Sequence, residues 1–111
     1  MSLDYTWEKL HVAVIDLAAG TGSIQDRLYY AYSGALILLY EQDDFPEEMR
    51  EQFEAIQTEL TSVKPSGNEG SIKASTDAMT DSKATEIAKK IVSLYDSITR
   101  IVAIKNEALG Q

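Results

Sequence analysis

The side chains in this sequence best suited to chemistry are carboxylates that gather in one stretch. From Glu41 to Val63, eight acidic residues are opposed only by Arg50, so the stretch carries a net charge of −7. Clustered carboxylates can hold a divalent cation, but this run lacks the ligand spacing and central glycine of a calcium-binding loop. They can also attract a basic protein partner. We therefore predict no metal site and an acidic surface, made up of Asp43, Asp44, Glu47, Glu48 and Glu51.

Groups for nucleophilic or acid–base catalysis are scarce. His11 is the only histidine and cysteine is absent, so a metal site or a catalytic triad would lack the companions that each requires. The sequence also contains no phosphate-binding loop with its lysine. We predict no catalytic residues, no metal and no cofactor, and we do not expect an enzyme.

Charge and hydropathy restrict the partners and the compartment. The formal net charge is −8 and no basic patch is present, which argues against binding to nucleic acid. The most apolar run, Ala35 to Tyr40, is far shorter than the roughly 18 to 20 residues that span a bilayer. No secretory signal is recognisable, and the absence of cysteine is typical of a reducing compartment. We expect no membrane contact and a cytoplasmic location.

Four helices are predicted to position these groups, and the last of them organises the others. From Ser82 to Ala108, aliphatic residues recur every three or four positions with no glycine or proline between them. A first helix is expected from Thr6 to Ala19, with Asp4 or Thr6 as its N-cap. Gly20 is expected to end this helix in the left-handed conformation.

The second helix is the one that points to a partner. It is predicted from Ile24 to about Tyr40, with Ser23 as its N-cap, and it is apolar on nearly every side. Such a helix lies either at the centre of its own bundle or against another chain, and a chain with so few helices favours the second. We predict a partner surface, most simply that of a homodimer, formed by Tyr30, Ser33, Gly34 and Ile37.

The remaining segments complete a single domain over residues 1–111. A third helix is expected after Pro46, where acidic residues favour the positive end of the helix dipole, and it should reach about Val63. Residues 64–81 are rich in glycine, serine and threonine and are predicted to be a connection. Residues 1–3 are interpreted as a remnant of cloning. The predicted fold is all-α, an up-down four-helix bundle with a long connection before the last helix.

Helical spacing also predicts which side chains are buried, because residues three and four apart share one face of a helix. The predicted core consists of Trp7, Leu10, Val14, Leu17, Leu28, Tyr32, Leu39, Phe53, Ile56, Leu60, Ile87, Ile91, Leu94, Ile98 and Ile101.

A different function is implied by residues 12–22, VAVIDLAAGTG, which resemble motif I of the S-adenosylmethionine-dependent methyltransferases. In that motif a strand ends in an acid and a glycine-rich turn approaches the cofactor. The resemblance implies that Gly20 and Gly22 line the cofactor and that Asp16 is the acid of the motif. A second strand would end at Glu41, in the position of the ribose-binding acid. The alternative function is therefore a methyltransferase-like fragment that binds S-adenosylmethionine.

Three features of the sequence favour helices over this alternative. Ala18 stands where the motif usually has another glycine. Nothing after residue 45 is typical of a strand, whereas a doubly wound domain usually needs about 150 to 250 residues. Apolar residues from Trp7 to Leu17 also keep helical spacing through the supposed strand.

As a whole, the chain is similar to a family of small bacterial helical proteins in which three short motifs recur. Here they are W-x-K-L-H at Trp7–His11, G-S-I-x-x-R-L at Gly22–Leu28 and D-F-P-E-E at Asp44–Glu48. The resemblance implies a helical fold and no particular activity. The leading interpretation is a small cytoplasmic interaction or regulatory module, acting as a homodimer or with another protein partner.

Overall fold

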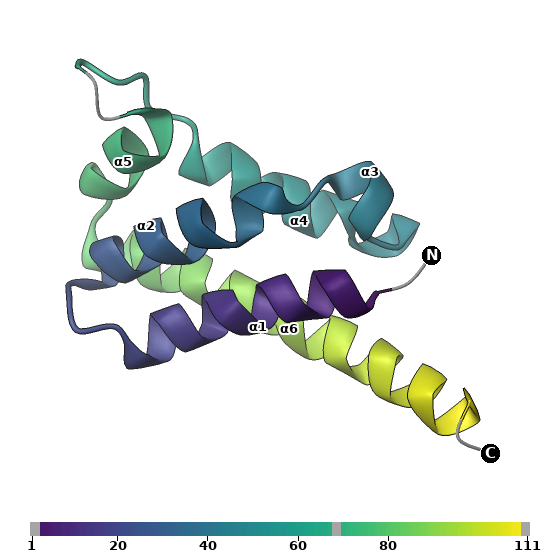
Figure 1. Ribbon diagram of the computed structural model, residues 1–111. Helices are drawn as coiled ribbons and strands as arrows, with labels where there is room; N and C mark the ends of the chain where they lie inside the picture. The colour runs from purple at the N-terminus through teal and green to yellow at the C-terminus, as the bar shows by residue number, and fades with distance from the viewer. Residues whose placement is uncertain (1–2, 68–69, 110–111) are drawn as a thin grey trace.

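The computed structural model describes residues 3–67 and 70–109, and this part of the chain is helical with no strand. The all-α prediction is confirmed (Figure 1). The elements are α1 (Asp4–Ala19), α2 (Ile24–Gly34), the 3₁₀ helix η1 (Leu36–Leu38), α3 (Glu41–Asp44), α4 (Glu47–Leu60), α5 (Gly70–Asp77) and α6 (Asp81–Leu109).

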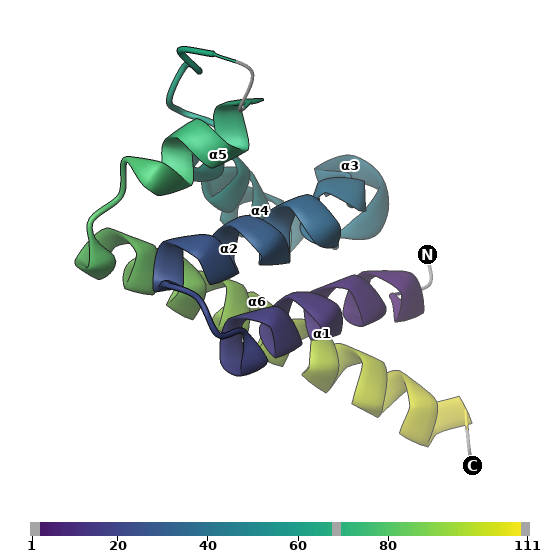
Figure 2. The same cartoon turned by 60° about the vertical axis from the view of Figure 1, so that its left-hand side comes forward.

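The longest helix, α6, is the element against which α1, α2 and α4 pack. Its 29 residues correspond to roughly 43 Å of helix, most of the 53 Å length of the molecule. α5 lies where α6 begins, whereas α3 lies at the opposite end, beside the start of α1 (Figures 1 and 2). The last turns of α6 extend away from the other helices in both views.

The aliphatic stripe of α6 forms the centre of the core. Ile87, Ile91, Leu94 and Ile98 are fully buried, whereas Ile101 is only half-buried. Burial therefore decreases toward the C-terminal end of the helix. In the predicted core as a whole, Trp7 and Val14 are likewise half-buried, and the remaining members are buried as expected.

The predicted second helix is too long at its C-terminal end. α2 stops at Gly34, because Ala35 leaves the helical region with φ −138° and ψ −59°. A 3₁₀ turn follows, in which side chains three apart lie above one another. That geometry turns both Leu36 and Leu39 into the core, where they are 0% and 1% exposed.

Two predictions at the ends of α1 are wrong. The helix begins at Asp4 with Leu3 in the N-cap position, and no side chain caps it. Thr6 is buried, and its hydroxyl donates a 2.6 Å hydrogen bond to the carbonyl oxygen of Asp44, so it joins α1 to α3. Gly20 has φ −64° and ψ 151°, an extended rather than left-handed conformation. Leu3, which the sequence analysis interpreted as part of a cloning remnant, is buried in the core.

The predicted N-cap of α2 is confirmed. Ser23 has an extended backbone, and its hydroxyl accepts a 3.0 Å hydrogen bond from the amide of Asp26. This bond satisfies one of the amides that have no partner within the first turn of a helix.

The helix predicted after Pro46 is α4, and its buried stripe is confirmed. Met49, Phe53 and two aliphatic residues after them are buried along one face. Phe45, just before the helix, is fully buried and stacks on Phe53 with ring centroids 4.4 Å apart. Pro46 is the N-cap residue of this helix.

The predicted connection, residues 64–81, contains a helix of its own, α5. Ser75 in this helix is buried and accepts a 2.9 Å hydrogen bond from the amide of Val63, which fixes α5 to the end of α4. Residues 68 and 69 lie outside the described part of the chain. With six α-helices among the described residues, the arrangement is more complex than the four-helix up-down bundle predicted from the sequence.

We expect Leu94→Ala to lower the free energy of unfolding by about 2 to 5 kcal/mol, because Leu94 is fully buried at the centre of the α6 stripe. Urea unfolding followed by circular dichroism would measure this change. Val92→Ala is the matched control, since Val92 is 45% exposed and should change stability far less. Equal effects of the two substitutions would show that α6 is not buried along this stripe.

Candidate interaction surfaces

The segment from α2 to the end of η1 exposes several large apolar side chains. Tyr30 is 62% exposed, Ile37 and Leu38 are each 47% exposed, and Tyr40 is 67% exposed. The 3₁₀ turn explains the exposure of Ile37 and Leu38, because Leu36 and Leu39 point into the core and the two residues between them face outward. We call Tyr30, Ile37, Leu38 and Tyr40 the α2–η1 apolar group.

Of the four predicted interface residues, Tyr30 and Ile37 belong to this group, and Ser33 and Gly34 lie between them in the sequence. Tyr30 and Ile37 are exposed as predicted. Ser33 is half-buried, and its hydroxyl donates a 2.7 Å hydrogen bond to the carbonyl oxygen of Tyr29. Gly34 is exposed, and a Cβ at this position would meet no atom within 4 Å. Packing within the chain therefore does not require a glycine there.

The predicted acidic surface divides into one structural residue and four exposed ones. The carboxylate of Asp44 accepts a 2.7 Å hydrogen bond from the amide of Tyr40, so it stabilises the short helix α3. The other four are exposed, and none forms an ion pair within the described part of the chain. They are Asp43, Glu47, Glu48 and Glu51.

Arg50, the only cation of this stretch, does not neutralise these carboxylates. Its guanidinium donates to the carbonyl oxygen of Phe45 at 3.2 Å and to that of Gln42 at 3.1 Å. These bonds connect the end of α3 to the first turns of α4. Arg50 therefore forms no ion pair with these carboxylates in the described part of the chain.

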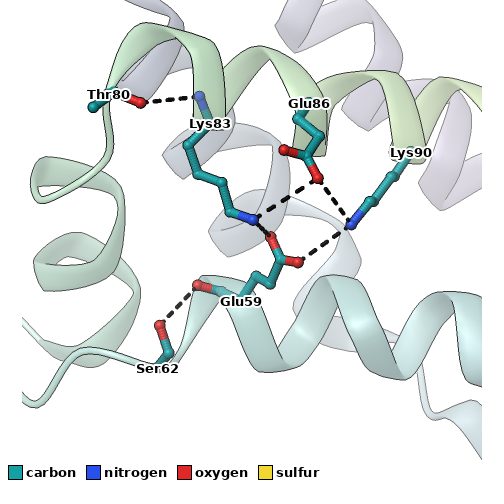
Figure 3. A network of polar contacts seen from close by, with 6 residues as sticks. All are labelled: Glu59, Ser62, Thr80, Lys83, Glu86 and Lys90. Atoms are coloured by element: carbon teal, nitrogen blue, oxygen red, sulfur yellow. Dashed lines mark hydrogen bonds and ion pairs between the residues drawn. The ribbon is translucent and has the colours of Figure 1, made fainter.

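A group of four charged side chains comes together between α4 and α6 (Figure 3). Oε2 of Glu59 lies 3.0 Å from Nζ of Lys83, and its Oε1 lies 3.2 Å from Nζ of Lys90. Glu86 approaches the same two ammonium groups, at 3.8 and 3.5 Å. Lys83 lies three residues before Glu86 and Lys90 four residues after it, so all three side chains share one face of α6. The two lysines can therefore contact both Glu86 and Glu59.

The environment of Glu59 changes its acidity. Partial desolvation by itself raises the pKa of this carboxyl, but the contacts with Lys83 and Lys90 outweigh that effect and hold the pKa below its ordinary value. Glu59 in turn raises the pKa of Lys90. The end of α4 and the first turns of α6 are thus joined by an ion-pair network.

His11 belongs to an aromatic contact between α1 and α6. Its ring stacks on Trp7, with centroids 4.8 Å apart and an angle of 14° between the planes. Nδ1 of His11 lies 3.2 Å from the hydroxyl of Tyr95, and the indole of Trp7 donates to Thr99 at 2.9 Å. Within residues 3–67 and 70–109, no three acidic or histidine side chains converge closely enough to hold a metal ion. The geometry gives His11 a packing role.

The residues implied by the methyltransferase resemblance are not brought together. Asp16, Gly20 and Gly22 lie at the C-terminal end of α1, whereas Glu41 begins α3, which is joined to Thr6 near the start of α1. The intervening helix separates the two places by roughly 20 Å. The first segment that this alternative needs as a strand lies within α1 and the second contains η1, so neither is a strand and the helical interpretation of residues 12–19 is confirmed.

Arg27 explains why Gly20 is a glycine. A Cβ on Gly20 would lie 2.6 Å from Cγ of Arg27 and 2.7 Å from the carbonyl oxygen of Asp16. The guanidinium of Arg27 donates to the carbonyl oxygen of Leu17 at 2.8 Å and to that of Gly22 at 3.2 Å. Arg27 thus closes the C-terminal end of α1, where carbonyl groups lack partners within the helix. The sequence interpretation missed this role, although the arginine lies within the G-S-I-x-x-R-L motif.

Comparison with known proteins does not assign these surfaces. No family model matches the chain, and no curated protein or solved structure is significantly similar to it. None of the described helices is both long enough and apolar enough to cross a membrane.

We expect Glu59→Gln to lower the free energy of unfolding by about 1 kcal/mol at neutral pH, because it removes the charge that the two lysines share. A carboxyl whose pKa is lowered by folding stabilises the protein above its unfolded-state pKa, ordinarily 4.5. That contribution is lost as the pH falls through the lower native-state pKa. The difference between wild type and variant should therefore disappear in acid, which chemical unfolding at several pH values would measure.

Glu54→Gln is the control for this measurement. Glu54 is exposed on the same helix and forms no ion pair within the described part of the chain. It should change stability little at any pH. A loss as large as that of Glu59→Gln would mean that the overall charge of α4, rather than the network, is responsible.

Proposed function

We propose that this protein is a cytoplasmic protein–protein interaction or regulatory module that forms a homodimer. The observation that supports the proposal is the α2–η1 apolar group, in which Tyr30, Ile37, Leu38 and Tyr40 are each about half exposed or more. Single exposed apolar side chains are ordinary on protein surfaces. From four large ones within residues 30–40 we infer a surface that another protein covers.

The chemistry of the group fits a protein partner. Tyrosine is enriched at protein interfaces because its ring buries a large apolar area while its hydroxyl can remain hydrated. Two of the four residues are tyrosines, and the other two are aliphatic. Burial of apolar area contributes about 25 cal/mol per Å², so covering such side chains would supply a substantial part of an association energy.

A homodimer is the simplest assembly for this surface. In a two-fold dimer the same patch contacts itself, so one apolar group covers its own copy. Gly34 lies within the segment, and the open space around its Cα would let the backbone of the second chain approach closely. In this proposal α1, α2, α4 and α6 act as an up-down bundle, and η1 presents the surface.

The proposal predicts that Ile37→Glu and Tyr30→Glu each convert a dimer into a monomer without unfolding the chain. A carboxylate in a buried apolar interface is strongly unfavourable, whereas both positions are exposed in the single chain. Light scattering coupled to gel filtration would give the mass, and circular dichroism would report the fold.

Ile15→Glu is a matched control, because Ile15 is 50% exposed but lies on α1. The mass of this variant should equal that of the wild type. A wild type that is monomeric at high micromolar concentration, or a dimer that survives both substitutions in the α2–η1 apolar group, would contradict the proposal.

A further inference from the structure

A groove lies where the C-terminal half of α1 and the start of α2 meet α6, on residues outside the α2–η1 apolar group. We call it the α1–α6 groove. Its volume of about 520 Å³ falls within the roughly 300 to 1,000 Å³ that is typical of small-molecule sites. Its apolar lining includes Val14, Ala18, Ile24, Ala88 and Val92.

The apolar side chains of this groove remain accessible to a ligand. Val92 is 45% exposed, and Ala18 is exposed as well. Val14, Ile24 and Ala88 are only half-buried. Because three helices contribute to the lining, these side chains surround a shared depression instead of forming a ridge on one helix. Covering them with an alkyl chain would remove apolar surface from water, which favours binding.

One edge of the groove is polar. Thr85, Lys89 and Ser93 line it, and their spacing of four residues places them in one row along α6. All three are exposed. Among the residues that the structure describes, Lys89 is the only charged one that lines the groove. The groove therefore combines an apolar floor with a single cation at its edge.

The ammonium group of Lys89 is available to an anion. No ion pair involves it in the part of the chain that the structure describes. Lys83 and Lys90, on the same helix, already contact carboxylates (Figure 3). Those carboxylates belong to Glu59 and Glu86. A carboxylate that entered the α1–α6 groove would therefore find its partner in Lys89.

We infer that the α1–α6 groove binds a free amphiphile that carries an alkyl chain and a carboxylate, the chemistry of a medium-chain fatty acid. The alkyl chain lies on the apolar floor, and the carboxylate faces Lys89. The hydroxyls of Thr85 and Ser93, one turn before and one turn after Lys89, are donors available to the same carboxylate. This binding site goes beyond the proposed dimer, which uses other residues.

The size and charge of the groove favour a free ligand over a membrane surface. From Thr85 to Ser93, α6 rises roughly 12 Å, which suits an alkyl chain of medium length. A chain with a net charge of −8 is repelled by an anionic bilayer. A small anion responds mainly to the charges nearest to it, because charges beyond about 8 to 10 Å are largely screened at physiological ionic strength.

The test is a titration of the full, isotope-labelled chain with decanoate, followed by nuclear magnetic resonance. Saturable shifts of amide signals should centre on Val14, Ala18, Ala88 and Val92. The absence of saturable shifts would overturn the inference. Shifts centred on Tyr30 and its neighbours would instead place the ligand on the α2–η1 apolar group, and would overturn the assignment to the groove.

Two further ligands separate the roles of the chain and the head group. Decyltrimethylammonium has the same alkyl chain with a cationic head, and it should bind at least about fivefold more weakly than decanoate. That order is opposite to the one expected from the net charge of −8 alone. Acetate has the carboxylate without the chain and should not bind. Equal binding of decanoate and the cationic amphiphile would overturn the assignment of the carboxylate to Lys89.

Two pairs of variants test the edge and the floor of the groove. Lys89→Gln should weaken decanoate binding about fivefold or more, whereas Lys64→Gln makes the same change at an exposed position before α5 and should weaken it less than about twofold. Ala18→Trp fills the groove and should weaken binding about tenfold or more. Ala19→Trp is its control, because Ala19 is exposed beside Ala18 but does not line the groove. Circular dichroism would verify that each variant folds, and equal effects within either pair would overturn the inference.

Discussion

Burial of the aliphatic stripe of α6 is the interaction on which the rest of this structure depends. Ile87, Ile91, Leu94 and Ile98 are inaccessible to solvent, and three other helices supply the surfaces that cover them. Burying side chains of this size contributes about 1.5 to 3 kcal/mol each. No other element could replace α6, because the apolar faces of α1, α2 and α4 would then lose the surface against which they pack. The exposed residues at the α6 C-terminus mark where this shared core ends.

Polar contacts determine where the covering helices lie along α6. The network of Glu59, Lys83, Glu86 and Lys90 joins the end of α4 to the first turns of α6, and His11 with Tyr95 joins α1 to its centre. Such partly exposed contacts add little energy compared with the core. Each of these contacts, however, requires its two partners at one particular position along the helices. An apolar stripe alone would allow one helix to slide along another. The network and the aromatic contact therefore contribute mainly to register.

The surfaces proposed to bind partners arise from the same packing constraints. The change from α2 to a 3₁₀ turn brings Leu36 and Leu39 into the core, and its consequence is the exposure of Ile37 and Leu38. Arg50 is held by backbone carbonyl groups between α3 and α4, and it forms no ion pair with the exposed acids beside it in the described part of the chain. Apolar and acidic surfaces are thus presented by different helices.

The sequence by itself determined the helical class, the α6 stripe and most of the buried residues, because helical hydrogen bonds are local and the spacing of apolar residues shows which face is covered. The exposure of Tyr30, which lies within α2, was predictable for the same reason. Only the tertiary structure decided where α2 stops and how Arg27 closes α1. These features depend on contacts between different elements, such as the burial of Leu36 and Leu39 in the shared core and the bond from Arg27 to the carbonyl oxygen of Leu17. Local periodicity carries no information about such contacts.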